Sequence, residues 1–354
     1  MDTTTNDMTE VCRNKVCKNK VFDTKSVNAT ATNHAASNDS INDDAVVSRI
    51  TSHKDRNAPI GLFDSGVGGL SVYLHLAQQL PSERYIYYAD TLNVPYGNRE
   101  SEDIETLTLS AVAWLYQQGC KLIVIACNSA SAYALEMARR YYPQLPIVGL
   151  VPALKPAVLA SNSGHVAVLA TKATLNGTLL SNVIDNFARP SNVEVVKYFD
   201  PQLVPWVEAG MPEQDETAQR LRLQLAVFSD VGVDQLVLGC THYPFFKAFL
   251  LDEIARQELS IQVIDSGQAI AERVKQLLFA KQLFAVAGDD GYNESPEAID
   301  DSSFKGRTIS SSARNPLIFY ATRYDSKLGD LIRRLLGKET VLHHHTQGIL
   351  PMLP

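Results

Sequence analysis

Two cysteines stand at equivalent places in the chain, each where a run of apolar residues gives way to small polar ones. Cys127 ends the run LIVIAC (122–127), and Cys240 ends the run LVLGC (236–240). Such runs predict buried strands. The backbone N–H groups of a turn that leads into a helix favour a thiolate and can also hold a carboxylate. Thiols at such strand ends therefore indicate acid/base or nucleophilic chemistry.

The elements that must position these thiols alternate between strand and helix. Strand–turn–helix units are predicted at 58–80 and 164–187, and further strands at 84–90, 121–127, 146–150, 194–200, 234–240, 261–265 and 316–322. Helices are predicted at 102–119, 131–142, 215–232, 245–257, 267–287 and 327–337. This alternation is typical of an α/β fold with a mainly parallel sheet.

The second half of this pattern repeats the first. The segment YYADTLNVPY (87–96) aligns with KYFDPQLVPW (197–206), because each has Asp, then Val-Pro, then an aromatic residue. The next strand-end cysteine comes 37 residues after Asp90 and 40 residues after Asp200. We therefore predict two pseudo-symmetric α/β domains with the active site in the cleft between them, since open α/β sheets bind ligands at the carboxyl ends of their strands.

The 354-residue chain also contains segments that differ from this core. The first 57 residues have no Leu, Gly, Tyr or Trp, so they cannot bury enough apolar surface and are predicted to be disordered. The strand at 261–265 and the elements after it are expected to rejoin the first domain. The predicted division is an extension at 1–57, a first domain at 58–150 plus 263–337 with an acidic loop at 288–303, a second domain at 151–262, and a tail at 338–354.

Composition excludes several classes of protein. The net charge of −7 and pI near 5.6 offer no basic field for nucleic acid. No apolar run approaches the roughly 18 residues of a membrane span. Five widely spaced cysteines fit a reducing compartment better than a disulfide scaffold. We expect a cytoplasmic protein, a monomer or homodimer, without a direct nucleic-acid or membrane partner.

Three other features resemble binding sites only in part. Cys12 and Cys17 are interpreted as exposed thiols, since no paired Cys/His cluster follows at ligand spacing. The histidines at 343–345 are interpreted as part of a tail rather than a metal site. DSGVGG (64–69) lacks the Lys-Ser/Thr ending of a phosphate loop, although its amides suit a small carboxylate. No metal site is predicted.

Three chemistries could use two facing thiols. Disulfide exchange usually needs Cys-x-x-Cys, which is absent. Hydrolysis needs one thiol and a base, and leaves the second thiol unexplained. Proton transfer at a stereocentre uses both, because one thiolate removes the Cα proton and the opposite thiol delivers another. Asp64, at a strand end, and His242, two residues after Cys240, could tune these thiols. Asp64 fits a helix N-cap equally well.

Six segments together resemble the glutamate racemases. They are GLFDSGVGGLSV, YYADTLNVPYGNR, VIACNSASA, VLATKAT, VPWVEAG and LVLGCTHYPF, and the similarity runs from about 58 to 337. The resemblance implies a cofactor-independent enzyme that interconverts L- and D-glutamate and supplies D-glutamate for peptidoglycan. PYGNR and CTHYPF favour the glutamate enzyme over the related aspartate racemases.

The resemblance also implies roles for individual residues. Cys127 would deprotonate D-glutamate with help from Asp64, and Cys240 would act on L-glutamate with help from His242 and Glu208. The residues implied to bind substrate are Asp64, Ser65, Pro95, Tyr96, Gly97, Asn128, Ser129, Thr174, Thr241 and His242. The family usually has Thr at the position of Ser129; a hydroxyl is kept.

The implied partners are glutamate and, as in some relatives with an N-terminal extension, a muropeptide nucleotide activator. Residues 1–57 offer no motif that matches those relatives. Two other hypotheses for the function of the whole chain stay open. One is a binding or regulatory protein that keeps the fold and acts on a partner such as gyrase. The other is an enzyme acting on aspartate or a cysteine hydrolase.

Overall fold

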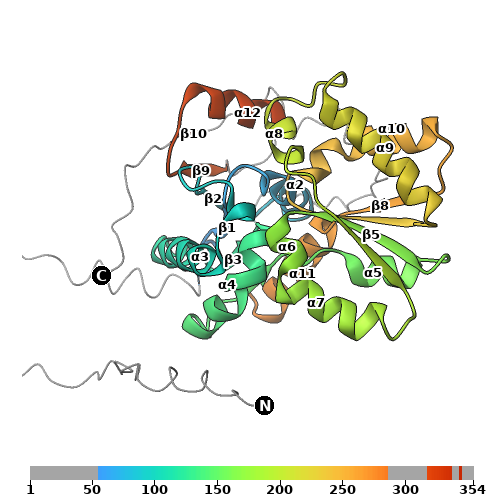
Figure 1. Ribbon diagram of the computed structural model, residues 1–354. Helices are drawn as coiled ribbons and strands as arrows, with labels where there is room; N and C mark the ends of the chain where they lie inside the picture. The colour runs from blue at the N-terminus through green and yellow to red at the C-terminus, as the bar shows by residue number, and fades with distance from the viewer. Residues whose placement is uncertain (1–54, 286–316, 337–342, 345–354) are drawn as a thin grey trace, which may run out of the picture. The chain divides into compact units, whose positions relative to one another are not determined.

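The computed structural model describes residues 55–285, 317–336 and 343–344 (Figure 1). The predicted acidic loop at 288–303, Cys12, Cys17 and nearly all of the predicted extension and tail lie outside the described residues. Within the described residues there are two sheets, and all of their strand pairs are parallel. This confirms the predicted α/β class with two mainly parallel sheets.

The first sheet has six described strands in the order β10-β9-β2-β1-β3-β4. They are β1 (Ile60–Asp64), β2 (Tyr85–Ala89), β3 (Leu122–Ile125), β4 (Ile147–Gly149), β9 (Ile318–Ala321) and β10 (His343–His344). The central strands are buried on both faces, which is why they read as almost continuous apolar runs.

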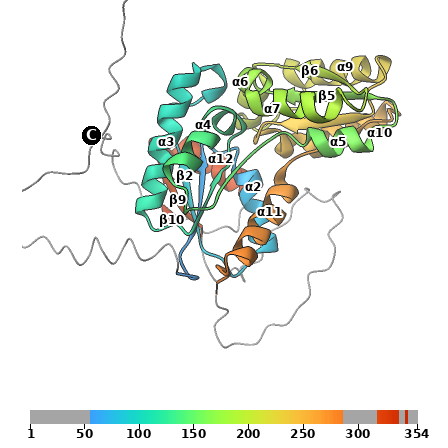
Figure 2. The same ribbon diagram turned by 90° about the horizontal axis from the view of Figure 1, so that it is seen from below.

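Two groups of helices cover the two faces of the first sheet. Alternate residues of β1 and β2 point to opposite faces, as the two-residue period of a strand requires. Leu62 and Tyr87 pack with one group of helices, and Phe63 and Tyr88 with the other. The first group is α2 (Leu70–Gln79), α11 (Gly267–Ala280) and α12 (Ser326–Leu336), and the second is α3 (Ser101–Gln117) and α4 (Asn128–Tyr141). This sheet and its helices are called the first lobe; Figure 2 shows α2 beside α11.

The second sheet has four described strands in the order β6-β5-β7-β8. They are β5 (His165–Ala170), β6 (Glu194–Tyr198), β7 (Gln235–Gly239) and β8 (Gln262–Ile264). On one face pack α8 (Leu203–Glu208), α9 (Glu216–Asp230) and α10 (Lys247–Arg256), and on the other α5 (Leu154–Ala160) and α7 (Thr178–Val183). This sheet and its helices are called the second lobe.

The position of β8 corrects one expectation. The sequence predicts that the strand at 261–265 rejoins the first domain, but β8 pairs with β7 in the second sheet, Leu236 opposite Val263. The helix α10 between β7 and β8 makes a parallel crossover, which places β8 next to the strand it follows. The return to the first lobe therefore starts with α11.

Within residues 55–285 the chain crosses between the lobes twice, and a hydrogen bond joins the two crossings. The Ser266 hydroxyl, just before α11, donates to the Val151 carbonyl, just after β4, at 2.9 Å. Short α6 (Lys172–Asn176) also bridges the lobes, because Ala173 packs in a first-lobe core and Leu175 in a second-lobe core. Among the described helices none is long and apolar enough to span a membrane.

Candidate active site

Asp64 lies at the carboxyl end of β1 and is 1% exposed. Its Oδ1 accepts hydrogen bonds from the Gly66 N–H at 2.8 Å and the Ser65 hydroxyl at 3.2 Å. Its Oδ2 accepts from the Thr241 hydroxyl of the second lobe at 3.0 Å. Burial raises the pKa of Asp64 above its ordinary value, although the charge of His242 and these hydrogen bonds act in the opposite direction. Asp64 therefore holds the loop that follows β1 through hydrogen bonds and also contacts the opposite lobe.

Cys127 follows β3 and is the N-cap residue of α4. Its sulfur accepts a hydrogen bond from the Ala130 N–H at 3.5 Å and lies 3.6 Å from the Ser65 hydroxyl oxygen. Burial, and then the nearby Asp64 carboxylate, raise the pKa of the Cys127 thiol to about 12, and the hydrogen bonds offset only part of this. At neutral pH Cys127 is therefore a thiol and can donate a proton.

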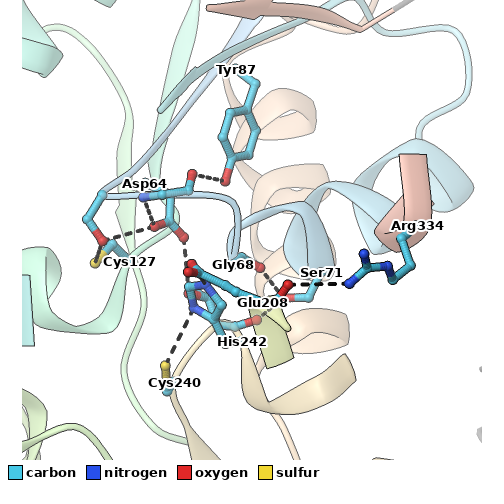
Figure 3. Close-up of polar contacts among 12 residues, drawn as sticks. Asp64, Gly68, Ser71, Tyr87, Cys127, Glu208, Cys240, His242 and Arg334 are labelled. Carbon is cyan, nitrogen blue, oxygen red and sulfur yellow. Dashed lines mark hydrogen bonds and ion pairs between the residues drawn. The ribbon is translucent and has the colours of Figure 1, made fainter. Parts of the chain in front are cut away.

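Cys240 follows β7 and has a histidine beside it (Figure 3). The His242 Nδ1 lies 4.0 Å from the Cys240 sulfur, and its Nε2 lies 3.3 Å from Glu208 Oε1. Burial disfavours the charged ring, but the hydrogen bonds with Cys240 and Glu208 outweigh it and raise the pKa of His242 to about 10. A cation therefore lies beside the second sulfur at neutral pH.

Both thiols line one cavity of about 40 Å³, together with loops from both lobes. Eight of the residues expected to bind substrate also line it: Ser65, Pro95, Tyr96, Gly97, Asn128, Ser129, Thr241 and His242. Asp64, Glu208 and Thr174 lie behind this lining. Asp64 contacts Ser65 and Thr241, and Glu208 contacts His242.

Thr171 lines the cavity, whereas the resemblance implies Thr174 of the same TKAT block. The Thr171 Oγ1 lies 2.9 Å from the Ser129 hydroxyl of the first lobe and 2.9 Å from the Thr174 hydroxyl. A Cβ added to Gly97 would lie 3.0 Å from the Thr171 Cβ. Thr171 directly follows β5, as Ser65 follows β1, so the internal repeat contained the signal for it. The apolar pair Val94 and Val204, equivalent in the repeat, was also missed.

The two repeated aspartates have different partners. Asp90 accepts hydrogen bonds from the Tyr96 hydroxyl at 2.6 Å and from the Thr322 hydroxyl, just after β9, at 2.9 Å. Asp200 instead pairs with Arg220 at 3.0 Å. Asp90 thus holds the Tyr96 wall of the cavity to the strand β9. Among the described residues no group of three His, Cys, Asp or Glu side chains is arranged to hold a metal ion.

Residues 60–274 match the family model described as Asp/Glu/Hydantoin racemase. A glutamate racemase of Deinococcus radiodurans is 49% identical over 220 residues, which are 62% of this chain and 74% of the relative.

Two solved structures share the fold. The glutamate racemase of Francisella tularensis in complex with D-glutamate superposes with a TM-score of 0.64 and 26% identity, covering 81% of this chain and 97% of that one. The Escherichia coli glutamate racemase, in complex with L-glutamate and the activator UDP-MurNAc-Ala, gives a TM-score of 0.62 and 29% identity, covering 83% and 100%.

Proposed function

Because the chain belongs to the Asp/Glu/Hydantoin racemase family, we propose that it interconverts L- and D-glutamate by proton transfer at Cα through Cys127 and Cys240. The observation that carries the proposal is that these two thiols, one from each sheet, line the same cavity. Two acid/base groups on opposite walls are what inversion at a stereocentre requires.

The proposed reaction from L-glutamate starts with Cys240 as thiolate and Cys127 as thiol. The Cys240 sulfur takes the Cα proton, and the electron pair of the C–H bond moves into the α-carboxylate to give an enolate-like intermediate. Cys127 then delivers its proton to the opposite face of Cα. D-glutamate leaves an enzyme with Cys240 as thiol and Cys127 as thiolate, which is the form that accepts D-glutamate.

Asn128 supports binding of a carboxylate in this cavity. Its side chain is 5% exposed, and within the described part of the chain its Nδ2 has no hydrogen-bond partner. Buried polar groups normally have a partner, so a donor left open at a cavity wall fits an acceptor supplied by substrate. Donors fixed in a dry site stabilise the charge that develops on the α-carboxylate during proton removal. We assign Asn128 to this task.

The roles of the groups behind the cavity follow from their contacts. Asp64 would hold the loop beside Cys127, and Glu208 would hold the His242 ring toward Cys240. Arg334 of α12 donates to the Glu208 carbonyl at 3.3 Å and helps to fix its place (Figure 3). D-glutamate formed in this way would serve peptidoglycan synthesis, the role implied for the family.

The test is incubation of the protein with L-glutamate in heavy water without added cofactor. The expected result is loss of the Cα–H signal in the NMR spectrum and decay of circular dichroism to zero. Cys127→Ser and Cys240→Ser should each lower kcat by about 10²- to 10⁴-fold, the usual effect of losing a general acid or base. Cys120→Ala is the matched control, because Cys120 is a buried thiol outside the cavity lining. If the wild-type protein shows neither deuterium uptake nor racemisation, the proposed activity is refuted. If deuterium uptake persists in both Cys127→Ser and Cys240→Ser, the two-thiol mechanism is refuted.

A further inference from the structure

We infer that Ser71 is a positioning residue for Cys240: its hydroxyl fixes the Cys240 loop of the second lobe against the first lobe. The inference rests on the proposed racemase function and assigns a role to a residue outside the cavity lining. Ser71 lies in the first turn of α2 and is 2% exposed.

The Ser71 hydroxyl lies between two carbonyl oxygens from different lobes. It is 2.9 Å from the Gly68 carbonyl of its own loop and 2.8 Å from the carbonyl of Thr241, the residue after Cys240. Both distances are within the hydrogen-bonding range, so the one hydroxyl proton is shared between them. Figure 3 shows Ser71 and Gly68 beside His242 and Asp64.

A second bond holds the same residue of the second lobe. The Thr241 hydroxyl donates to Asp64 Oδ2 at 3.0 Å, while its carbonyl accepts from Ser71. Thr241 is therefore held to the first lobe through both its backbone and its side chain. Because it stands between Cys240 and His242, this attachment also places the sulfur and the imidazole.

Gly68 shows how closely the lobes meet at this point. A Cβ on Gly68 would lie 2.4 Å from both His242 Nδ1 and Thr241 Oγ1, which is shorter than the contacts that real Cβ atoms make. The first-lobe loop therefore passes directly against the His242 ring. Ser71 holds both sides of this contact, since its two acceptors are the carbonyls of Gly68 and Thr241.

The contact between His242 and Cys240 depends on this placement and tolerates little movement. His242 Nδ1 is 4.0 Å from the Cys240 sulfur, at the outer limit of a hydrogen bond to sulfur. Without the Ser71 hydroxyl the two carbonyls lose a buried donor, which favours movement of the loop away from α2. A small movement would separate His242 from Cys240. The Cys127 sulfur contacts Ser65 and Ala130 of its own lobe, so its proton transfer would be affected less.

The experiment compares Ser71→Ala with the wild-type protein, using L- and D-glutamate deuterated at Cα. L- and D-glutamate have equal free energies in solution, so kcat/KM must fall by the same factor in both directions. We expect a fall of roughly 5- to 10-fold, the usual effect of one hydrogen bond. The informative readout is the isotope effect on kcat/KM. It should rise for L-glutamate, whose proton Cys240 removes, and fall for D-glutamate.

Three further variants make the test specific. Ser71→Thr keeps the hydroxyl and should restore the wild-type isotope effects. If Ser71→Ala does not fold, Ser71→Cys takes its place, because its thiol is a weak donor of similar size. The same change in the two isotope effects is then expected. Ser131→Ala is the matched control, because Ser131 is a buried serine that donates to Ile125 at 3.0 Å and accepts from Leu150 at 2.9 Å, away from the second lobe.

Two outcomes overturn the inference. One is a Ser71→Ala protein whose two isotope effects equal those of the wild type, and the other is the same redistribution in Ser131→Ala. Either result leaves the proposed function standing if the wild-type protein racemises glutamate. An inactive wild-type protein refutes the function itself, so the two failures are distinguishable.

Discussion

The surroundings of the two thiols differ although their places in the fold are equivalent. Cys127 and Cys240 each follow a central strand of a parallel sheet and line the same cavity. Beside Cys127 lies the carboxylate of Asp64, whereas beside Cys240 lies the imidazole of His242, itself paired with Glu208. The two halves of the repeat therefore place their thiols equivalently but differ in the charge of the side chain beside each thiol.

This difference places opposite charges beside the two thiols of the proposed mechanism. Burial, and then the charge of Asp64, keep the proton on Cys127, whose pKa is raised to about 12. A cation beside a sulfur is the arrangement that stabilises a thiolate. A two-base racemase needs one acid and one base at a time, and this distribution of charge favours the form that accepts L-glutamate.

The largest expected effect is on the reactivity of the two thiols. Iodoacetamide at pH 7.5 should label Cys240 at least about tenfold faster than Cys127, because the thiolate is the reacting species. His242→Gln should slow labelling at Cys240 and leave Cys127 unchanged. Peptide mass spectrometry measures both rates, with Cys120 as a buried reference outside the cavity lining. Faster labelling of Cys127 would contradict the charge difference.

The next effect is on stability as a function of pH. His242 has a pKa of about 10 in the folded protein, against about 6.5 in an unfolded chain. Its charged form therefore stabilises the fold fully below about pH 6.5, and this contribution is lost as pH rises through about 10. The difference in unfolding free energy between wild type and His242→Gln should shrink by more than about 1.4 kcal/mol between pH 6 and pH 10, the value of a one-unit shift. Urea titrations at both pH values measure it; a constant difference would mean that folding does not raise the pKa of the ring.

The smallest effect concerns a contact between the lobes on the Cys127 side of the cavity. The Ser129 and Thr171 hydroxyl oxygens lie 2.9 Å apart across the lobes. Ser129→Ala should raise KM by about 3- to 10-fold, from the loss of about 1 kcal/mol of hydrogen bonding. Ser129→Thr keeps the hydroxyl and should stay within about twofold of wild type. Equal KM values for the two variants would show that this bond is not used.

Much of the site was predictable because parallel strands end at a common edge. The apolar runs before Cys127 and Cys240 identified the strands, and the internal repeat in the sequence paired the two cysteines. The resemblance to glutamate racemases then named eight residues that line the cavity. Periodicity and strand-end position are local properties, so the sequence displays them directly.

The parts that were not predicted depend on how the two sheets meet. Ser71 contacts the opposite lobe, and no local pattern says which residues face across a cleft. The prediction that β8 belongs to the first sheet was wrong for a related reason. Three residues of strand carry too little pattern to choose between two sheets, and only the pairing with β7 decides it.

The place of β9 in the first sheet has a consequence for the order in which the protein is completed during synthesis. The strands β5 to β8 are contiguous in the chain, so the second sheet can form as soon as residue 264 has emerged from the ribosome. The first sheet must wait for β9 at 318–321, because until then no described strand lies beside β2 on that side. Asp90 gains its Thr322 partner only at that late stage. The Tyr96 wall thus gains this support only after both thiols have been translated.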